Sequence, residues 1–493
     1  MDLKRKIFNE LLMWKKNKEK ECLILYGPRQ VGKTTIVERL GETYESFIKI
    51  DFVQSPHLKK IFQLNKDDEV ELSSENILKR ITANMRDAKL VPGNTLIFID
   101  EIQKCGEART ALKYLANDSR YDVIASGSLL GLAYGQDDDP EVNEPDSIPV
   151  GFEKPLTMYS LDFEEFLWAY GYSEEKIKYL KEFYENNELV PSEINNKYEE
   201  LFREFMVVGG MPEVVSTFME TKDFNKVQEV QDKIIKDYWN DIALHAKGVE
   251  KVKVRKCFDS VPRQLSKENK KFQYSKVESG KTGRYFSNSI QWLKDSGLVN
   301  VCYNVYEPYI PLVGNEIEDM FKLYYHDTGL LCSIYGFETK LAILNNTIKG
   351  NAKGGIYENV IGELLVKKGH KLHYIKNDNS IMEIEFLIEK NGEVLPVEVK
   401  AGNDTTISLN YFVEKWKPSI AYKFIKGNIG FNSPKKTIPH YMIMFLWLMA
   451  NYPQVKRNNF STMLKRQIKD LWLFQLANIL VKDLMKRNWI LYL

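Results

Sequence analysis

One stretch near the amino end constrains the fold more than any other: residues 22–35 read CLILYGPRQVGKTT. The apolar run CLILY predicts a buried strand, and the residues after the loop predict the first turn of a helix. The loop between them matches the G-x-x-x-x-G-K-[ST] pattern of a phosphate-binding loop. The predicted phosphate-binding residues are Gly27, Pro28, Arg29, Gln30, Val31, Gly32, Lys33, Thr34 and Thr35.

Each part of this loop has a chemical reason. Glycines allow the backbone to approach an anion closely, and successive N–H groups at a helix N-terminus point at phosphate. Lys33 would reach the β- and γ-phosphates, and the Thr34 hydroxyl would bind Mg²⁺. The alternative is a glycine-containing turn that binds no ligand and matches the pattern by chance. The strand before it and the helix after it favour the phosphate site.

A second stretch, residues 96–103, reads LIFIDEIQ. Four apolar residues predict a strand that is buried on both faces, and two acids follow. We expect Asp100 to hold Mg²⁺ and Glu101 to orient and polarise an attacking water. A third strand at 121–126 ends in Ser126, whose hydroxyl would sense the γ-phosphate. Ordinary turn residues would look the same at that position.

Up to residue 160 the pattern alternates strand and helix, which predicts a parallel sheet with ligands at the carboxyl ends of its strands. The strands are expected at 22–26, 46–52, 95–100, 121–126 and 156–160. A chain of 493 residues has room for about three domains. The predicted units are a nucleotide-binding core at 1–160, a helical lid or linker at 161–245, a winged-helix-like unit at 246–335, a second α/β domain at 336–447 and a basic, hydrophobic extension at 448–493.

Composition excludes several classes of protein. The formal net charge is +1, so a nucleic acid or an acidic membrane would have to be met by a local patch. The five cysteines contain no C-x-x-C pair, which argues against zinc and against a disulfide framework and fits a reducing cytoplasm. The charged amino-terminal helix is no signal peptide. The longest apolar run, 441–450, is too short for a membrane helix.

The unit at 246–335 has the element order of a winged helix. Helices are predicted at 252–265 and 285–295, and hairpin strands at 298–305 and 311–313. Lysines and an arginine around the second helix could contact the phosphates of DNA. A solvated face of a protein-docking domain explains the same charges equally well. Before this unit, Gly209 and Gly210 are predicted to link two helices rather than to form a turn beside the nucleotide.

A third informative stretch, residues 381–401, reads IMEIEFLIEKNGEVLPVEVKA. Two alternating strands flank an Asn-Gly pair, which is a strong hairpin signal. With that pair as the loop, Glu385 lies opposite Glu398 and Glu383 lies opposite Lys400. All four would share one face, and the other face would be a continuous apolar core.

Two opposed carboxylates favour a cation between them, or one of them stays protonated. Glu385 and Glu398 are therefore candidate Mg²⁺ ligands, and Lys400 a candidate to stabilise charge on a scissile phosphate. Glu358, in the preceding helix, would orient this site. A surface hairpin with solvated acids is the alternative.

The motifs LYGPRQVGKTT, LIFIDEIQ and IASGS resemble those of AAA-type P-loop ATPases from bacteria and archaea. The later segments FMVVGGMPEVV, SIQWLKDSGLV, FKLYYHDTGLL and IEFLIEKNGEVLPVEVKAG resemble the C-terminal domain that accompanies such ATPases. That domain is similar to restriction-endonuclease-like nucleases. Its acid…Glu-x-Lys signature falls on Glu385, Glu398 and Lys400, and Glu358 matches the helix acid. The resemblance covers residues 1–447.

Two positions depart from the family pattern. The first metal-binding acid is usually Asp, whereas Glu385 is one methylene longer. Phe152 stands where relatives often carry an arginine, so we assign no arginine finger.

The resemblance implies an α/β protein in which a P-loop NTPase sheet is followed by a winged-helix unit and a restriction-endonuclease-like domain. The implied function is Mg²⁺-dependent ATP hydrolysis coupled to a nuclease-like module, with DNA as a candidate partner and a homo-oligomer as a candidate assembly. In that site Lys33 and Glu101 would serve hydrolysis, and Lys400 would serve cleavage. The alternative is a nucleotide-dependent switch whose C-terminal domains bind a partner without cutting nucleic acid.

Overall fold

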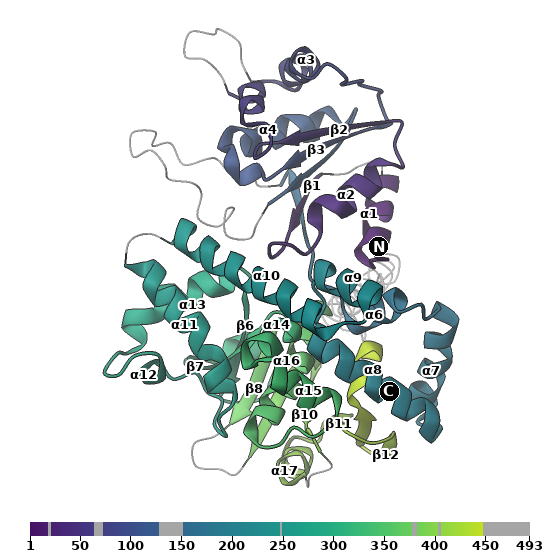
Figure 1. Cartoon of the computed structure of the whole chain (residues 1–493), viewed down its shortest axis with the longest axis vertical. Helices are drawn as coiled ribbons and strands as arrows, with labels where there is room; N and C mark the ends of the chain where they lie inside the picture. Colours follow the sequence, from purple (N-terminus) through teal and green to yellow (C-terminus); the bar gives the residue numbers. More distant parts are fainter. Residues whose placement is uncertain are drawn as a thin grey trace, which may run out of the picture. The chain divides into compact units, whose positions relative to one another are not determined.

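The computed structural model describes residues 1–17, 21–63, 72–127, 151–246, 249–376, 382–402 and 406–446 (Figure 1). The predicted extension at 448–493 lies outside these residues, as does the end of the apolar run at 441–450, from residue 447 on. No helix in the described ranges is long and apolar enough to cross a membrane.

The first sheet has five strands in the order β2-β3-β4-β1-β5, and every neighbouring pair is parallel (Figure 1). Its strands are β1 Cys22–Tyr26, β2 Ser46–Asp51, β3 Thr95–Asp100, β4 Asp122–Ser126 and β5 Glu153–Thr157. The predicted parallel sheet is confirmed. β5 begins earlier than the expected 156–160, because it is an edge strand whose polar first residues carry no apolar signal.

Helices cover both faces of this sheet. They are α1 Ile7–Lys16, α2 Lys33–Gly41, η1 Pro56–Ile61, α3 Ser74–Asn84, η2 Ile102–Lys104 and α4 Gly106–Asp118. Buried side chains of α3 and α4 form one cluster with Ile24, Ile50 and Ile99 of the strands. α2 packs on β3 and β4, with α1 beside it. Both faces of β3 are therefore buried, as its uninterrupted apolar run predicts.

A helical segment follows, comprising α6 Phe163–Ala169, α7 Glu174–Asn186, α8 Ser192–Val208, α9 Pro212–Thr221 and α10 Phe224–His245. α6 begins with a capping box in which Asp162 and Glu165 satisfy each other's backbone N–H groups. Gly209 and Gly210 link α8 to α9, as predicted. A Cβ on Gly210 would lie 2.0 Å from the carbonyl oxygen of Leu161, so the link also needs glycine for close packing.

The next elements are α11 Glu250–Leu265, α12 Tyr274–Val277, α13 Gly283–Asp295, β6 Val299–Val305, η3 Leu312–Asn315 and β7 Glu316–Tyr325. The strand expected at 311–313 is wrong: that segment forms η3, and β7 starts at Glu316. Pro311 and Gly314 favour a turn there, and Pro311 has no N–H to give to a ladder. The helix and hairpin order agrees with a winged helix, which stays a prediction.

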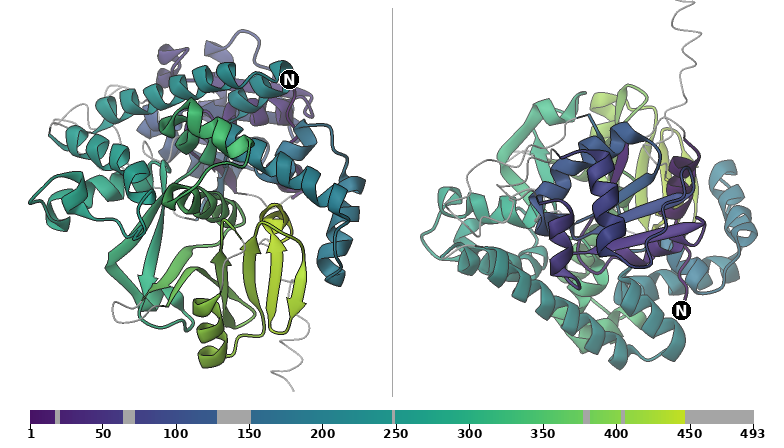
Figure 2. Two further views of the ribbon diagram at one scale, coloured as in Figure 1. Left: turned by 60° about the horizontal axis from the view of Figure 1, so that its bottom comes forward. Right: turned by 90° about the horizontal axis from the view of Figure 1, so that it is seen from above.

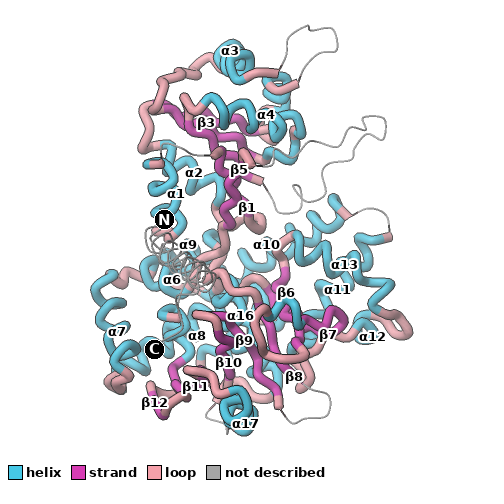
Figure 3. The backbone as a smooth tube through the Cα atoms, turned by 180° about the vertical axis from the view of Figure 1, so that it is seen from behind, coloured by secondary structure: helices cyan, strands magenta, loops and turns pink. Residues whose placement is uncertain are grey.

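β6 and β7 continue into a second, mixed sheet of eight strands, in the order β12-β13-β11-β10-β9-β8-β6-β7. Figure 2 shows these strands side by side, from teal to yellow-green, and Figure 3 shows them in magenta. The remaining strands are β8 Leu372–Lys376, β9 Glu383–Lys390, β10 Glu393–Val399, β11 Ala421–Ile425, β12 Gly430–Asn432 and β13 Lys435–Pro439. One sheet thus spans the predicted boundary between residues 335 and 336; the boundaries themselves stay a prediction.

Helices also flank the second sheet. They are α14 Thr328–Tyr335, α15 Phe337–Leu344, α16 Asn351–Lys367, α17 Ile407–Trp416 and η4 His440–Phe445. Leu409 and Phe412 of α17 join a buried cluster with β9. α16 approaches β9 through Gly362, where a Cβ would lie 3.0 Å from the Phe386 ring. α16 is thereby held close to the acids of β9.

Candidate functional site

The phosphate-loop pattern forms the turn between β1 and α2. Gly27 has φ +153°, and a Cβ on it would lie 2.2 Å from the carbonyl oxygen of Met158. Gly32 has φ +94° and caps α2, where a side chain would be strained. The two glycines are therefore required by the backbone. The loop leads directly into the N-terminus of α2, an arrangement suited to binding an anion.

Lys33 lies inside this loop. Its Nζ donates hydrogen bonds to the carbonyl oxygens of Gly27 at 2.9 Å and Pro28 at 2.8 Å. Burial lowers the pKa of Lys33 to about 8, because the ammonium group has lost most of its water. An anion in the loop would stabilise this desolvated charge.

Two of the predicted residues, Thr34 and Ser126, contact a third, Asp100. Thr34 Oγ1 donates to Asp100 Oδ2 at 2.9 Å, and the Ser126 hydroxyl donates to Oδ1. The hydroxyl and carboxylate are oxygen donors of the kind Mg²⁺ prefers, and Mg²⁺ commonly takes only one or two protein ligands. No cluster of three or more His, Cys, Asp or Glu that could hold a metal occurs among the described residues. Thr34 and Asp100 therefore fit Mg²⁺ only if phosphate and water complete its coordination.

The structure adds Lys49 of β2 to this edge of the sheet, a residue that the sequence reasoning missed. Its Nζ lies 2.9 Å from Glu38 Oε1, 3.7 Å from Asp51 Oδ2 and 3.9 Å from Asp100 Oδ2. A lysine inside an otherwise apolar strand was the available signal. Its ammonium group offsets part of the negative charge around Asp100.

Glu101 follows β3 in a left-handed conformation, with φ 55° and ψ 48°. Such a backbone is uncommon for a residue with a side chain and recurs at functional sites. Its Oε2 accepts a hydrogen bond from Gln103 Nε2 at 2.6 Å. The conformation separates the two acids, so that Asp100 and Glu101 have different partners.

Helix α10 contacts the phosphate loop, which no sequence pattern indicates. Asp241 Oδ2 lies 2.8 Å from Arg29 Nε, and Gln30 Nε2 donates to Asp237 Oδ2 at 2.9 Å. The Tyr238 hydroxyl donates to the carbonyl oxygen of Arg29 at 3.4 Å. Burial raises the pKa of Asp241 to about 6, against the opposing effect of Arg29. Two of the predicted phosphate-binding residues thus have protein partners on a distant helix.

The predicted hairpin forms with the expected turn, since Lys390 pairs with Glu393 and the register holds to Phe386 and Val397. The predicted strict alternation is wrong. β8 pairs His373 with Leu387 and Ile375 with Ile384, so two residues of β9 bulge opposite one of β8. Ile384 and Leu387 consequently share one buried cluster.

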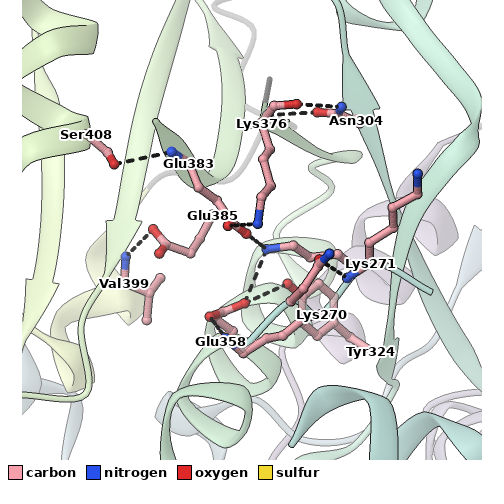
Figure 4. A network of polar contacts seen from close by, with 12 residues as sticks. Lys270, Lys271, Asn304, Tyr324, Glu358, Lys376, Glu383, Glu385, Val399 and Ser408 are labelled. Atoms are coloured by element: carbon pink, nitrogen blue, oxygen red, sulfur yellow. Dashed lines mark hydrogen bonds and ion pairs between the residues drawn. The ribbon is translucent and has the colours of Figure 1, made fainter. Parts of the chain in front are cut away.

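The β9–β10 ladder keeps the predicted register but ends at Phe386 and Val397, so the predicted pairs Glu385–Glu398 and Glu383–Lys400 are not part of it. Glu385, Glu398 and Lys400 still meet: Lys400 Nζ lies 3.3 Å from Oε1 of each glutamate. Glu385 Oε2 also accepts from the backbone N–H of Val399 at 3.1 Å (Figure 4). The ammonium group of Lys400 therefore takes the place predicted for a cation between the two acids.

Two further acids, Glu383 and Glu358, lie beside Glu385 (Figure 4). We call Glu358, Glu383, Glu385 and Glu398 the carboxylate cluster. The buried Lys322 of β7 lies 2.7 Å from Glu383 Oε1 and 3.5 Å from Glu358 Oε2. Lys376 and Lys270 contact the other oxygens of these glutamates, at 2.6 Å and 3.0 Å. Each acid therefore has a lysine partner.

The pKa values reflect this pairing. Burial raises the pKa of Glu385 to about 7, although Lys400 opposes the shift. Burial also acts on Glu383, but Lys322 and Lys376 lower its pKa to about 2. Glu385 and Glu398 share the single ammonium group of Lys400, whereas Glu383 and Glu358 share Lys322 and each has a further lysine partner. Mg²⁺ between Glu385 and Glu398 stays a prediction.

The all-parallel sheet, the phosphate loop after β1 and the Asp-Glu pair after β3 define a P-loop NTPase domain. Residues 19–167 match the family model described as AAA domain, so this part of the chain is an AAA-type ATPase domain. Residues 199–341 and 353–439 match two families described as domains of unknown function, DUF8612 and DUF4143.

Among solved structures, the Walker-type ATPase PABY2304 of Pyrococcus abyssi is similar at 14% identity and a TM-score of 0.39, covering 68% of this chain and 96% of that one. AMPPCP-bound DnaA from Aquifex aeolicus is similar at 13% identity and a TM-score of 0.26, covering 59% and 86%. TM-scores this low say nothing about function. No curated protein sequence matches the chain.

Proposed function

We propose that this protein is an ATP-hydrolysing switch, in which ATP bound at the phosphate loop alters the position of α10 and, through it, the C-terminal domains. The observation that carries this proposal is the contact of Arg29 and Gln30 with Asp241 and Asp237 of α10. It joins the predicted nucleotide site to a helix outside the AAA domain.

The nucleotide chemistry would be performed by residues of β1, β3 and the loop. Lys33 would exchange its carbonyl partners for phosphate oxygens, and Glu101 would take a proton from the attacking water. Thr34 and Asp100 would hold Mg²⁺, with Ser126 orienting Asp100. When bound, Mg²⁺ neutralises charge on the phosphates.

The other half of α10 contacts the C-terminal part of the chain. Ser333 of α14 accepts a hydrogen bond from Gln228 Nε2 at 2.7 Å and donates one to Asp232 Oδ1 at 2.7 Å. Gln231 accepts from the buried Lys340. A rigid helix with polar contacts at both ends is suited to carry a displacement from one domain to another.

Electrostatics give the direction of the switch. A triphosphate in the loop would place negative charge near the carboxylates of Asp237 and Asp241, and like charges repel. It would also compete with Asp241 for Arg29. ATP binding is therefore expected to weaken the hold of α10 on the loop, and the hold of α10 is expected to weaken ATP binding.

Replacing Asp241 with Asn is expected to tighten the binding of a non-hydrolysable ATP analogue about fivefold, because a partly buried ion pair is worth on the order of 1 kcal/mol. Titration calorimetry with Mg²⁺ measures the change. Glu229→Gln is the control, since it removes the same charge from an exposed position of α10. Equal affinities for both variants, or weaker binding by Asp241→Asn, would contradict the switch.

Nuclease activity of the C-terminal domains is the second candidate, favoured by the meeting of Glu385, Glu398 and Lys400. The position of Lys400 Nζ between Glu385 and Glu398 argues against it. We expect plasmid DNA to remain intact with Mg²⁺ or Mn²⁺, with and without ATP. Gel analysis of wild type and Lys400→Ala decides between the candidates. Cleavage that the variant loses would establish the nuclease and a role for DNA as its substrate.

A further inference from the structure

Gln103 lies one turn after β3, in η2, and its side-chain amide contacts Glu101. Gln103 Nε2 donates to Glu101 Oε2 at 2.6 Å. An ionised carboxylate only accepts hydrogen bonds, so the amide nitrogen must face it. This contact assigns the two ends of the amide, so that its carbonyl oxygen, Oε1, is the group left to accept a hydrogen bond.

That carbonyl oxygen is buried and has no hydrogen-bond partner in the described part of the chain. Buried carbonyl groups are almost always paired, so an unpaired one beside a predicted site indicates a missing partner. A water molecule can supply the hydrogen that Oε1 needs.

The backbone on both sides restricts where these groups can point. Glu101 is held with φ 55°, and Gln103 sits in a 3₁₀ turn whose first bond runs from Lys104 N–H to the Glu101 carbonyl oxygen at 2.9 Å. The strained backbone at Glu101 and the tight turn after it hold the side chains of Glu101 and Gln103 close to each other.

We infer that Gln103 is a second water-positioning residue: its Oε1 accepts one hydrogen of the attacking water while Glu101 accepts the other. The inference rests on the proposed ATP hydrolysis. In that reaction the water oxygen bonds to the γ-phosphorus. The bond between the γ-phosphorus and the β–γ bridging oxygen breaks, and ADP leaves with the electron pair of that bond. The proton passes to Glu101, and the products are ADP and inorganic phosphate.

Two acceptors on one water fix its orientation more narrowly than one does, and orientation contributes heavily to phosphoryl transfer. Gln103 also donates to Glu101, which keeps that carboxylate aimed at the same water. Both effects act on the reaction step and leave the ground-state contacts of the triphosphate with the loop unchanged.

The test uses the full chain with Gln103→Met, which keeps the length of the side chain and removes both hydrogen-bonding groups. The turnover number for Mg²⁺-ATP should fall about 10²-fold, as for other losses of a positioning contact, while the dissociation constant for a non-hydrolysable analogue stays within about twofold. Gln54→Met, at an exposed position before η1, is the control and should change neither value.

A double variant separates positioning from a structural role. If Gln103 acts through the water that Glu101 holds, Glu101→Gln with Gln103→Met should be no slower than Glu101→Gln alone within about threefold. Additive losses, turnover unchanged in Gln103→Met, or analogue binding and melting temperature falling together with turnover would each overturn the inference. Absence of ATP turnover in the unsubstituted chain would overturn the inference and the proposed function together.

Discussion

Glutamine in place of Glu101 is expected to lower the turnover number for ATP by about 10²- to 10³-fold, the loss typical of a removed general base or charge-stabilising group. Glutamine has nearly the same shape, so the strained turn after β3 and the contact with Gln103 can persist. A neutral amide cannot take the proton of the attacking water. Phosphate release under saturating Mg²⁺-ATP measures the loss.

Nucleotide affinity should respond differently. Glu101 would act on the water and make no ground-state contact with the phosphate loop, so analogue binding should stay within about twofold of wild type. Glu42→Gln, at an exposed position just after α2, serves as the matched control. Turnover equal to wild type in Glu101→Gln would remove the role that we assign to this residue.

Replacing Lys33 with methionine is expected to weaken ATP binding by at least about 10²-fold, because charge-assisted hydrogen bonds contribute about 1.5–3 kcal/mol each in such sites. The ammonium group already lies inside the loop and is desolvated. Phosphate binding therefore adds little to the free-energy cost of removing water from this group. Titration calorimetry with ATP and Mg²⁺ measures the loss.

The folded state should tolerate this change. Methionine retains the apolar length of the side chain and removes a desolvated charge, which offsets the loss of the hydrogen bonds to the carbonyl oxygens of Gly27 and Pro28. Lys60→Met, at an exposed position of η1, is the control. Wild-type affinity in Lys33→Met, with the melting temperature unchanged, would exclude the loop as the triphosphate site.

Local patterns predicted much of this molecule because their physical causes are local. β1 and β3 occupy the predicted residues, since short apolar runs bounded by turn residues favour buried strands. The phosphate loop is a contiguous pattern whose glycines meet backbone demands within a few residues. The turn of the β9–β10 hairpin follows from two adjacent residues, Asn391 and Gly392.

The errors came where a partner from a distant element intervened. The alternation of β9 fails at Glu385 because β8, which the hairpin pattern does not include, forces a bulge. Lys322 of β7 comes from outside the hairpin and pairs with its Glu383, and Lys270 pairs with Glu358 of α16. A pattern that counts only neighbours along the chain cannot place these ammonium groups.

By itself, the sequence determined the class of the first domain and the turn that would hold phosphate, because backbone sterics and apolar periodicity operate over a few residues. Tertiary structure alone decided that α10 lies against the phosphate loop and that lysines fill the carboxylate cluster. The first arrangement depends on the ion pair of Arg29 with Asp241, more than 200 positions apart, and the second on that of Lys322 with Glu383, about 60 positions apart. The cost of desolvating these charges has to be offset within one folded core.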